Sequence, residues 1–398
     1  MSLLPVDEAI RRLLAGVEIL GAEDVPLVQA GGRVLAADLA ARLTQPPFPA
    51  SAMDGYAVQA AEAKKGATLG IIGASRAGER FDGTLGAGEA VRIFTGAPVP
   101  HGADSILIQE NTDRRGNAIG VVESAEPGRH IRPAGLDFRS GDVLLRTGRV
   151  LDSRAIALTA AMGHASVPVR RKPRVAILSN GDELVPPGTI PGPDQIVSSN
   201  GVGLAALVRE VGGEPLDLGI APDRREAIRE RVERAAGSDI LVVVGGASVG
   251  EHDLVQGALT EAGMALGFWK IAMRPGKPLM VGRLGSMRVL GLPGNPVSAL
   301  VCGHIFLQPL IRTMLGLPAE SGLSSANLAV PMAENDGRQD YVRATLRIVD
   351  ERRLVTPFAR QDSSMLATLA AANALIVRAV RAPAAAAGDE VPILLLAP

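Results

Sequence analysis

The sequence predicts a multidomain α/β protein with a central, doubly wound and mostly parallel α/β domain. The chain has 398 residues, enough for about two to four domains of ordinary size. Between residues 173 and 320, short aliphatic segments alternate with helical patterns. On either side, residues 46–138 and 321–398 contain short β-type segments separated by Gly, Pro and Asp, which predict two β-rich domains.

Two helical patterns flank the first of these β-rich domains. One covers residues 7–14, after Pro5, and the other covers residues 153–162, where Ser153 is a suitable N-cap. We expect these helices to pair in a helical linker region, residues 1–45 plus 139–172, into which the β-rich domain of residues 46–138 is inserted.

The central domain, residues 173–320, carries the clearest pattern. Continuous aliphatic segments predict strands at 174–179, 216–220, 239–244, 267–273 and 287–292. Such strands are typical of a parallel sheet that is covered on both faces. Helices are predicted at 201–210 with Asn200 as cap, at 224–235, and at 296–315 with Asn295 as cap and Pro296 as first residue. In the C-terminal β domain, residues 321–398, we predict strands at 341–349, 354–357 and 374–380.

The composition argues against several kinds of partner and site. The chain has 41 Lys and Arg against 42 Asp and Glu, a net charge of −1, which argues against a nucleic-acid or acidic-membrane partner. It lacks a run of about 18 apolar residues and a signal-peptide pattern, so we expect a cytoplasmic protein without a transmembrane helix. The single cysteine, Cys302, lies in an apolar stretch and is expected to be buried rather than catalytic. The histidine spacing does not predict a zinc site.

Two loops follow predicted strands of the central domain, where open α/β sheets bind their ligands. In the first, Asp182 and Glu183 can hold a divalent cation or orient water, although Asp182 can also simply cap a turn. In the second, residues 241–253, Gly245 and Gly246 allow an anion to approach the backbone, and Ser248 adds a hydroxyl group. Asp253 ends this loop and either caps the next helix or binds a metal.

Further along the chain, Lys270, Arg274 and Lys277 fall within eight residues, around Pro-Gly, and predict an oxyanion site. The alternative is a solvated strand edge. The sequence Gly294-Asn295-Pro296 predicts a helix N-terminus that can bind an anion, although a plain strand-to-helix turn explains it equally well.

The inserted domain contributes three more polar segments. Asp54 lies in SAMDGYAV, Thr95 in IFTGAPVP, and Arg132 and Asp137 in RPAGLDF, but no spacing rule connects them. From the residues alone, the prediction is an oxyanion-binding α/β domain that handles a phosphorylated ligand together with a divalent cation.

Taken in order, the segments PPFPASAMDGYAV, IFTGAPVP, SNGDEL, GGASVGEHD, RPGKP and GLPGNPVSA resemble one family, the molybdopterin molybdenumtransferases, which includes the E domain of gephyrin. The resemblance covers essentially the whole chain from Val6. It implies a helical linker region, an inserted β domain, an α/β domain like that of molybdopterin adenylyltransferases and a C-terminal β domain. It also implies elongated homodimers.

The implied reaction inserts molybdate into adenylylated molybdopterin, hydrolyses the phosphoanhydride and releases AMP, with a divalent cation, usually Mg²⁺. The resemblance implies catalytic carboxylates at Asp54, Asp137, Glu183, Asp223 and Asp253, of which Glu183 and Asp253 are assigned to the metal. It implies molybdate or phosphate binding at Ser248, Lys270, Arg274, Lys277, Pro278, Ser298, Arg338, Arg343 and Ser363. The sequence does not decide between Arg338 and Arg343, or between Ser363 and Ser364. Substrate-cleft residues are expected at Thr95, Gly245, Gly246, Gly294 and Asn295.

Two alternatives stay open on the sequence. One is a molybdopterin adenylyltransferase, against which the inserted SAMDGYA domain argues, and the other is a non-catalytic scaffold of the same family. Tungstate is nearly isosteric with molybdate, so the preferred oxyanion is undecided. An adenylyltransferase is the expected donor of the adenylylated substrate.

Overall fold

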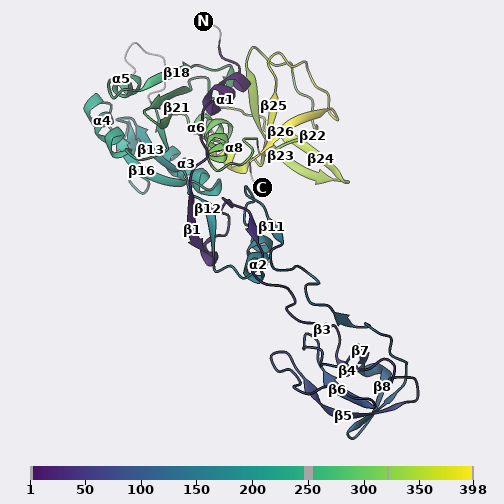
Figure 1. Ribbon diagram of the computed structural model, residues 1–398. Helices are drawn as coiled ribbons and strands as arrows, with labels where there is room; N and C mark the ends of the chain where they lie inside the picture. Colours follow the sequence, from purple (N-terminus) through teal and green to yellow (C-terminus); the bar gives the residue numbers. More distant parts are fainter. Residues whose placement is uncertain (1–2, 246–253, 321, 397–398) are drawn as a thin grey trace. The chain divides into compact units, whose positions relative to one another are not determined.

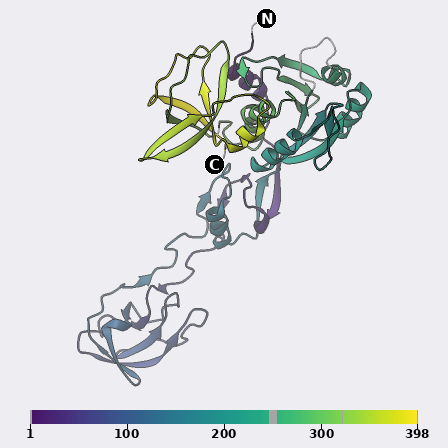
Figure 2. The ribbon, with the colours of Figure 1, turned by 180° about the vertical axis from the view of Figure 1, so that it is seen from behind.

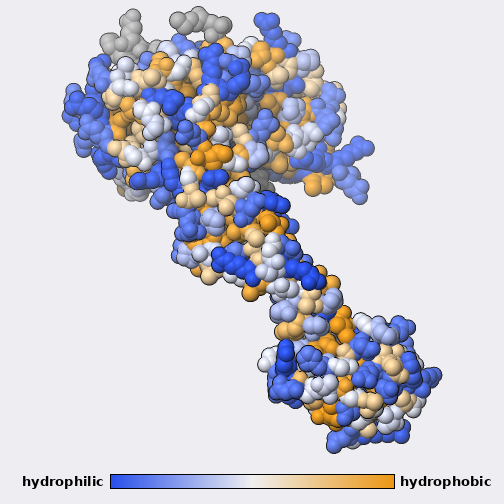
Figure 3. Space-filling view, in the orientation of Figure 1, coloured by the Kyte–Doolittle hydropathy of each residue, from blue (hydrophilic) through white to orange (hydrophobic). Residues whose placement is uncertain are grey.

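The computed structural model describes residues 3–245, 254–320 and 322–396 (Figure 1). The chain divides into two compact units, residues 1–23 with 170–398, and residues 24–169. On the visible face of each unit, polar side chains are interspersed with apolar ones (Figure 3). The two units are described separately.

The unit of residues 24–169 contains a six-stranded sheet in the order β7-β4-β6-β5-β9-β8. Its strands are β4 (Gly55–Val58), β5 (Thr68–Ser75), β6 (Glu89–Ile93), β7 (Ser105–Ile108), β8 (Thr112–Arg115) and β9 (Ala118–Val121). Successive side chains of β4 enter different cores: Tyr56 and Val58 pack in one hydrophobic cluster and Ala57 in another. This alternation is expected when both faces of a sheet are covered.

The rest of this unit surrounds helix α2 (Ser153–Ala161) and has its own core, which includes Leu35, Leu151 and Val167. The short elements near α2 are the 3-10 turn η1 (Leu27–Gln29) and the strand pair β2 (Leu39–Ala40) with β11 (Val143–Leu145). The 3-10 turn η2 (Gln109–Asn111) contacts β4 and β8 of the six-stranded sheet, and β3 (Ala50–Ser51) pairs with β10 (Ile131–Arg132). Strands β1 (Ala22–Pro26) and β12 (Ser166–Arg170) also pair.

Two details of the predicted linker region are wrong. The cap of α2 is Asp152 rather than Ser153: the backbone N–H of Ala155 donates to Asp152 Oδ1 at 2.8 Å. A carboxylate is a strong acceptor for these free N–H groups, and Asp152 has the extended backbone that an N-cap needs. Helix α1 (Val6–Leu14) does not pair with α2, because it belongs to the other unit and packs against α7 (Gln308–Met314).

The other unit contains the predicted α/β domain. Its sheet has the order β16-β13-β17-β21-β20-β18. Strands β13 (Arg174–Asn180), β16 (Glu214–Ala221), β17 (Ile240–Val244) and β21 (Met287–Leu292) are parallel, whereas β18 (Ala265–Trp269) and β20 (Met280–Leu284) form an antiparallel edge. The structure therefore confirms a mostly parallel sheet.

Helices cover both faces of this sheet (Figures 1 and 2). Helices α4 (Arg225–Arg234) and α5 (Leu254–Glu261) pack on the face that carries Leu178, Leu241 and Val289. Helices α3 (Asn200–Glu210) and α6 (Pro296–Cys302) contact each other and the sheet, α3 through β13 and α6 through β21. Asn200 is the first residue of α3 rather than its cap; Ser199 holds the cap position without a side-chain capping bond.

A helical run joins this domain to its neighbour. Helix α6 continues through the π-helical segment η3 (Gly303–Leu307) into α7. Among the described residues, only Pro296–Met314 is long and apolar enough to pass a test for membrane spans, with a mean hydropathy of 1.3. Since 67% of this window is buried inside the protein, it has the character of a core helix.

The last part of the chain forms a closed, barrel-like sheet. Its strands are β22 (Leu323–Leu328), β23 (Gln339–Val349), β24 (Arg352–Pro357), β25 (Ala374–Arg378) and β26 (Glu390–Leu395), with helix α8 (Leu366–Ala371) between β24 and β25. The order is β19-β23-β24-β22-β26-β25, and the additional β23–β25 pairing closes it. Its core includes Leu328, Val355 and Ile393.

The predicted strand 267–273 is wrong, because the structure divides it. Lys270 has a positive φ of 65° and turns the chain after β18. The next strand, β19 (Met273–Arg274), then joins the C-terminal sheet beside β23. A continuous apolar segment does not reveal from the sequence alone that its two halves belong to different sheets.

Candidate active site

A cleft of about 860 Å³ lies at the carboxyl ends of β13, β17 and β21. Parallel strands bring these ends together, and the polypeptide leaves each strand through a loop with small or polar residues. The lining residues are Ser179, Asn180, Gly181, Glu183, Leu184, Ile196, Val197, Ser198, Ser199, Asn200, Asp223, Val244, Gly245, Leu254, Val255, Pro278, Pro293, Gly294, Asn295, Pro296 and Ser364.

The first wall of the cleft carries two carboxylates, Glu183 and Asp223. The Asn180 Nδ2 group donates a hydrogen bond to Asp223 Oδ1. The backbone N–H of Asp223 donates to Asp182 Oδ1 at 3.0 Å, so Asp182 fixes the turn that carries Asp223. Asn180 is only 6% exposed, and its Oδ1 atom is buried without a partner among the described residues. A buried amide of this kind holds the Asp223 side chain in one orientation.

A close approach between two strand ends forms the floor. Gly245 has a φ of +92°, and a Cβ atom at this position would lie 2.3 Å from the carbonyl oxygen of Asn180. Only glycine fits both the backbone conformation and this contact. The predicted importance of Gly245 therefore has a local steric cause that does not depend on a ligand.

The loop before α3 and the loop before α6 meet at a third wall. The Asn200 Nδ2 group donates to the carbonyl oxygen of Gly294 at 2.7 Å. Ser198 Oγ donates to Ser179 Oγ at 3.2 Å, in the buried part of the same wall. Asn200 thus fixes the turn from which the α6 N-terminus faces the cleft.

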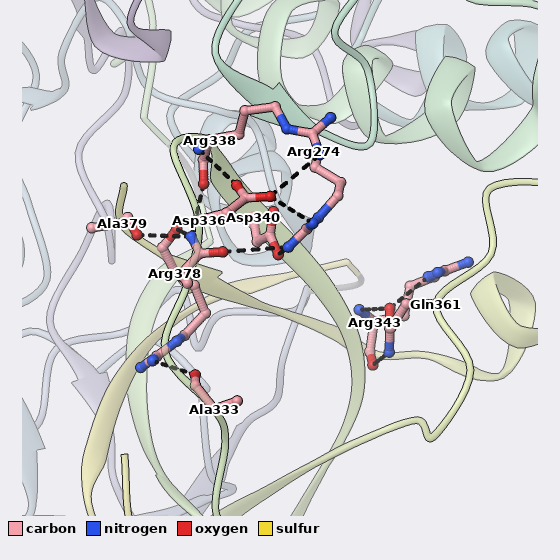
Figure 4. Close-up of polar contacts among 10 residues, drawn as sticks. Arg274, Ala333, Asp336, Arg338, Asp340, Arg343, Gln361, Arg378 and Ala379 are labelled. Atoms are coloured by element: carbon pink, nitrogen blue, oxygen red, sulfur yellow. Dashed lines mark hydrogen bonds and ion pairs between the residues drawn. The ribbon is translucent and has the colours of Figure 1, made fainter. Parts of the chain in front are cut away.

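The loop of residues 358–364 reaches this cleft from the C-terminal sheet. Asn295 Nδ2 donates to Ser363 Oγ at 2.9 Å, and the backbone N–H of Val297 donates to the Ser363 carbonyl at 3.1 Å. Arg343 lies beneath this loop and is only 1% exposed (Figure 4). Its Nε group donates to Gln361 Oε1 at 3.0 Å, and its Nη1 group donates to the Asp362 carbonyl at 2.6 Å. Burial lowers the pKa of Arg343.

The predicted cations occupy different surroundings. Pro278 lines the cleft, and its neighbour Lys277 is exposed. The Lys270 Nζ atom lies 4.3 Å from the centre of the Trp269 ring, in a cation–π contact. Arg274 forms ion pairs with acidic side chains of the C-terminal domain, which are described below.

The other predicted members of the anion site lie outside the cleft lining. Ser298 is 4% exposed in the first turn of α6. Arg338 Nη2 lies 3.4 Å from Asp336 Oδ2. The predicted residues Gly246, Ser248 and Asp253 lie outside the described residues.

In the other unit, the structure brings Asp54 and Thr95 together. The backbone N–H and the hydroxyl of Thr95 donate to Asp54 Oδ1 at 2.7 and 2.8 Å. These two bonds, with a smaller contribution from Arg92, lower the pKa of Asp54. Asp137 is exposed, and its backbone N–H donates to the Gln45 carbonyl at 3.0 Å.

The described part of the cleft offers few side chains that could bind a metal ion. Within the described ranges, no group of three or more His, Cys, Asp or Glu residues is placed to hold a metal ion. Glu183 and Asp223 are the carboxylates that line the described cleft. Two carboxylate ligands suit Mg²⁺ when substrate phosphates and water complete its coordination.

Sequence reasoning missed the amides Asn180 and Asn200 and the hydroxyl of Ser198. Asn180 is the residue just before the Gly181 loop, and VSSN at 197–200 is a polar run at the start of a helix. Both were visible signals, but their partners, Asp223 and Gly294, lie 43 and 94 residues away.

Comparisons with known proteins identify the family of this chain. Residues 4–163 match the MoeA N-terminal region (domain I and II), residues 176–313 a probable molybdopterin binding domain, and residues 325–396 the MoeA C-terminal region (domain IV). A protein named molybdopterin molybdenumtransferase 2 from Mycobacterium tuberculosis is 38% identical over 369 residues, covering 88% of this chain and 89% of the relative. The molybdopterin molybdenumtransferase of Haemophilus influenzae is 35% identical over 402 residues, covering 98% of both chains.

A solved structure is similar over nearly the full length. The molybdopterin biosynthesis MoeA protein from Pyrococcus horikosii has a TM-score of 0.85 and 31% sequence identity, and the match covers 99% of each chain.

Proposed function

Because the chain belongs to the molybdopterin molybdenumtransferase family, we propose that it inserts molybdate into adenylylated molybdopterin, with hydrolysis of the phosphoanhydride and release of AMP. The observation that carries this proposal is the cleft of about 860 Å³ at the strand ends. Clefts of roughly 300–1,000 Å³ accommodate ligands the size of a nucleotide conjugate. This one combines carboxylates, amides and hydroxyls with an exposed helix N-terminus.

Glu183 and Asp223 are the proposed catalytic carboxylates of this cleft. Asp223 is held by Asn180 and by the turn at Asp182, so its free oxygen has a fixed direction. Glu183 is exposed and can orient the attacking water or bind the cation. Mg²⁺, when bound here, would neutralise negative charge on the phosphoanhydride. We propose Asp253 as a further ligand on the basis of the resemblance alone.

The molybdate subsite is proposed beside the cleft, near Lys277, Pro278, Ser298 and Ser363. Lys277 supplies a positive charge, and Ser298 and Ser363 supply hydroxyl groups. Asn295 fixes Ser363 by the hydrogen bond described above. The position of Arg343 beneath the 358–364 loop supports a role in placing Ser363 and Ser364.

Several further proposals rest on the resemblance. Asp54, Thr95 and Asp137 contribute to activity from the inserted domain, and Lys270, Gly245 and Gly294 contribute to the cleft. The enzyme is a cytoplasmic homodimer that receives its substrate from a molybdopterin adenylyltransferase. We also propose four domains with the predicted boundaries, except that residues 1–23, which include α1, belong to the unit of residues 170–398.

The decisive experiment measures AMP release from adenylylated molybdopterin with Mg²⁺, in the presence and absence of molybdate. Molybdate-dependent AMP release, with the metal retained on the pterin, supports the proposal. Synthesis of adenylylated molybdopterin from ATP and molybdopterin instead assigns the protein to the preceding adenylyltransferase step. Neither activity in a folded protein favours the scaffold.

A pair of variants tests the assignment of the carboxylate. Glu183→Gln removes the charge while keeping the shape of the side chain, and should lower AMP release at least about 100-fold, as expected for a lost acid–base or metal-binding group. Glu230→Gln, on the exposed surface of α4, is the matched control and should retain full activity. Full activity of the Glu183→Gln variant would remove Glu183 from the mechanism.

A further inference from the structure

The turn of residues 270–278 connects the two six-stranded sheets of its unit. It leaves β18 at Trp269 and places β19 against β23, with Met273 opposite Gln339 and Arg274 opposite Asp340. The backbone N–H of Gln339 donates to the Ala272 carbonyl at 2.8 Å. The same turn contains Pro278, which lines the cleft, and its neighbour Lys277.

Arg274 contacts three side chains of the C-terminal domain, and its own side chain is 46% exposed (Figure 4). Its Nη1 group donates to Asp336 Oδ2 at 3.0 Å. Its Nη2 group donates to Asp340 Oδ2 and lies 3.4 Å from Asn335 Oδ1. Asp340 is only 8% exposed. Two carboxylates of the same chain therefore balance the charge of this guanidinium.

The acidic partners of Arg274 are themselves held in place. Asn335 Nδ2 donates to the carbonyl oxygens of Arg338, Arg378 and Ala379 at 2.7, 3.1 and 2.8 Å. Arg378 Nη2 in turn donates to the Ala333 carbonyl at 3.1 Å. These bonds fix the 333–340 loop independently of Arg274, so the loop is a rigid receptor for the guanidinium.

Transferring Arg274 to an oxyanion would be costly. It would leave the buried carboxylate of Asp340 without its cationic partner, and a buried charge without a partner is unfavourable. Burial raises the pKa of Asp340, and the hydrogen bond from Arg274 opposes that rise. Arg274 and Lys277 are both exposed, but Lys277 forms no ion pair with a described residue.

We propose that Arg274 is a positioning residue rather than a molybdate ligand: its bonds to Asp340 and Asp336 fix the turn that presents Lys277 and Pro278 to the cleft. This inference rests on the proposed molybdate subsite. It departs from the sequence-based expectation that all three cations of this segment contact the anion. The structure supports the distinction because Arg274 has partners in the C-terminal domain, whereas Lys277 has none among the described residues.

The test compares the molybdate concentration that gives half-maximal AMP release in Arg274→Met, Asp340→Asn and Asp336→Asn. A positioning role predicts that all three variants raise this concentration by roughly 3- to 10-fold, since each weakens the same link. The double variant Arg274→Met/Asp340→Asn should be no worse than the poorer single variant, as expected for coupled residues. The maximal rate at saturating molybdate should change less than about 3-fold.

A direct ligand role predicts a different pattern. Arg274→Met would then raise the half-saturating concentration, whereas Asp340→Asn and Asp336→Asn, which release the guanidinium, would lower it or leave it unchanged. That pattern would overturn the inference. Because Asp336 has a side chain that is 48% exposed, its variant tests the inference even if Asp340→Asn does not fold.

Lys277→Met separates this inference from the proposed function. A strong rise in half-saturating molybdate supports the subsite at Lys277. An unchanged value removes that subsite and, with it, the basis for this inference, whereas failure of the Arg274 pattern alone leaves the subsite standing.

Discussion

Gly276 offers the sharpest test of how the 270–278 turn is built. Its φ is +108°, and a Cβ atom there would lie 2.5 Å from Cys302 Sγ and 3.2 Å from Met273 Sδ. Cys302 is completely buried in α6 and donates to the Gly276 carbonyl at a distance of 3.9 Å. The turn therefore rests directly on the helix, with no room for a side chain.

The expected cost of Gly276→Ala has two parts. A backbone conformation that L residues rarely adopt costs about 1–3 kcal/mol. Inserting a methyl group into a packed site costs about 1–3 kcal/mol more. We therefore expect the free energy of unfolding to fall by about 2–6 kcal/mol.

Two further variants separate these parts. Gly285→Ala is the control for backbone strain, because Gly285 has a φ of +60° and a Cβ atom added there would meet no heavy atom within 4 Å. It should cost about 1–2 kcal/mol. Adding Cys302→Ala to Gly276→Ala removes the steric contact and should restore about 1–3 kcal/mol.

Urea unfolding followed by tryptophan fluorescence measures these changes in the free energy of unfolding close to the 270–278 turn. The protein has one tryptophan, and Trp269 immediately precedes this turn. The reasoning is refuted if Gly276→Ala is no more destabilising than Gly285→Ala. It is also refuted if Cys302→Ala adds its own cost to Gly276→Ala without any recovery.

Three other predictions concern local bonds. Asp152→Ala should lower the unfolding temperature at pH 7, measured by calorimetry. The hydrogen bonds that Asp152 accepts lower its pKa to about 2, so the difference in unfolding temperature between variant and wild type should shrink as the pH falls from 4 through 2. Gln361→Leu leaves donors of buried Arg343 unpaired and should cost about 1–3 kcal/mol in thermal unfolding, with loss of molybdate-dependent activity. Gly55→Ala places a Cβ atom 2.1 Å from the Leu107 carbonyl oxygen and should cost at least about 3 kcal/mol, seen as an early transition in circular dichroism.

The α/β domain could be predicted because its strands are continuous aliphatic runs. Strands β13 and β17 are enclosed by helices and neighbouring strands, so their sequences reflect burial on both faces. The antiparallel edge of the sheet, β20 and β18, was harder to predict from the sequence. Strand β20 follows the cationic turn within two residues of Pro278 and carries Arg283, so it lacks a simple apolar run.

The caps could not be resolved from the sequence for a different reason. Asp152 and Ser153 are both good cap residues, as are Ser199 and Asn200. At α2 the Asp152 carboxylate forms the capping bond, whereas at α3 neither residue caps the helix and Asn200 donates to the Gly294 carbonyl, 94 residues away. Local preference therefore narrows the candidates without choosing among them.

The candidate site shows the same limit. The sequence placed Glu183, Gly245 and Asn295 near the strand ends, and these residues do line one cleft. It could not distinguish Arg274 from Lys277, because charge alone was visible. The partners of Arg274, Asp336 and Asp340, lie 62 and 66 residues further along the chain.

Two separate links join the cleft to the C-terminal sheet. One is the β19–β23 pairing with the Arg274 ion pairs, and the other is the bond between Asn295 and Ser363. Each of the two domains has its own hydrophobic core, to which neither link contributes. Their common effect is to fix Lys277 and Ser363, which come from different sheets, relative to the same helix, α6. An oxyanion that needs both a cation and a hydroxyl group in fixed positions gives a functional reason for this arrangement, which core packing alone does not require.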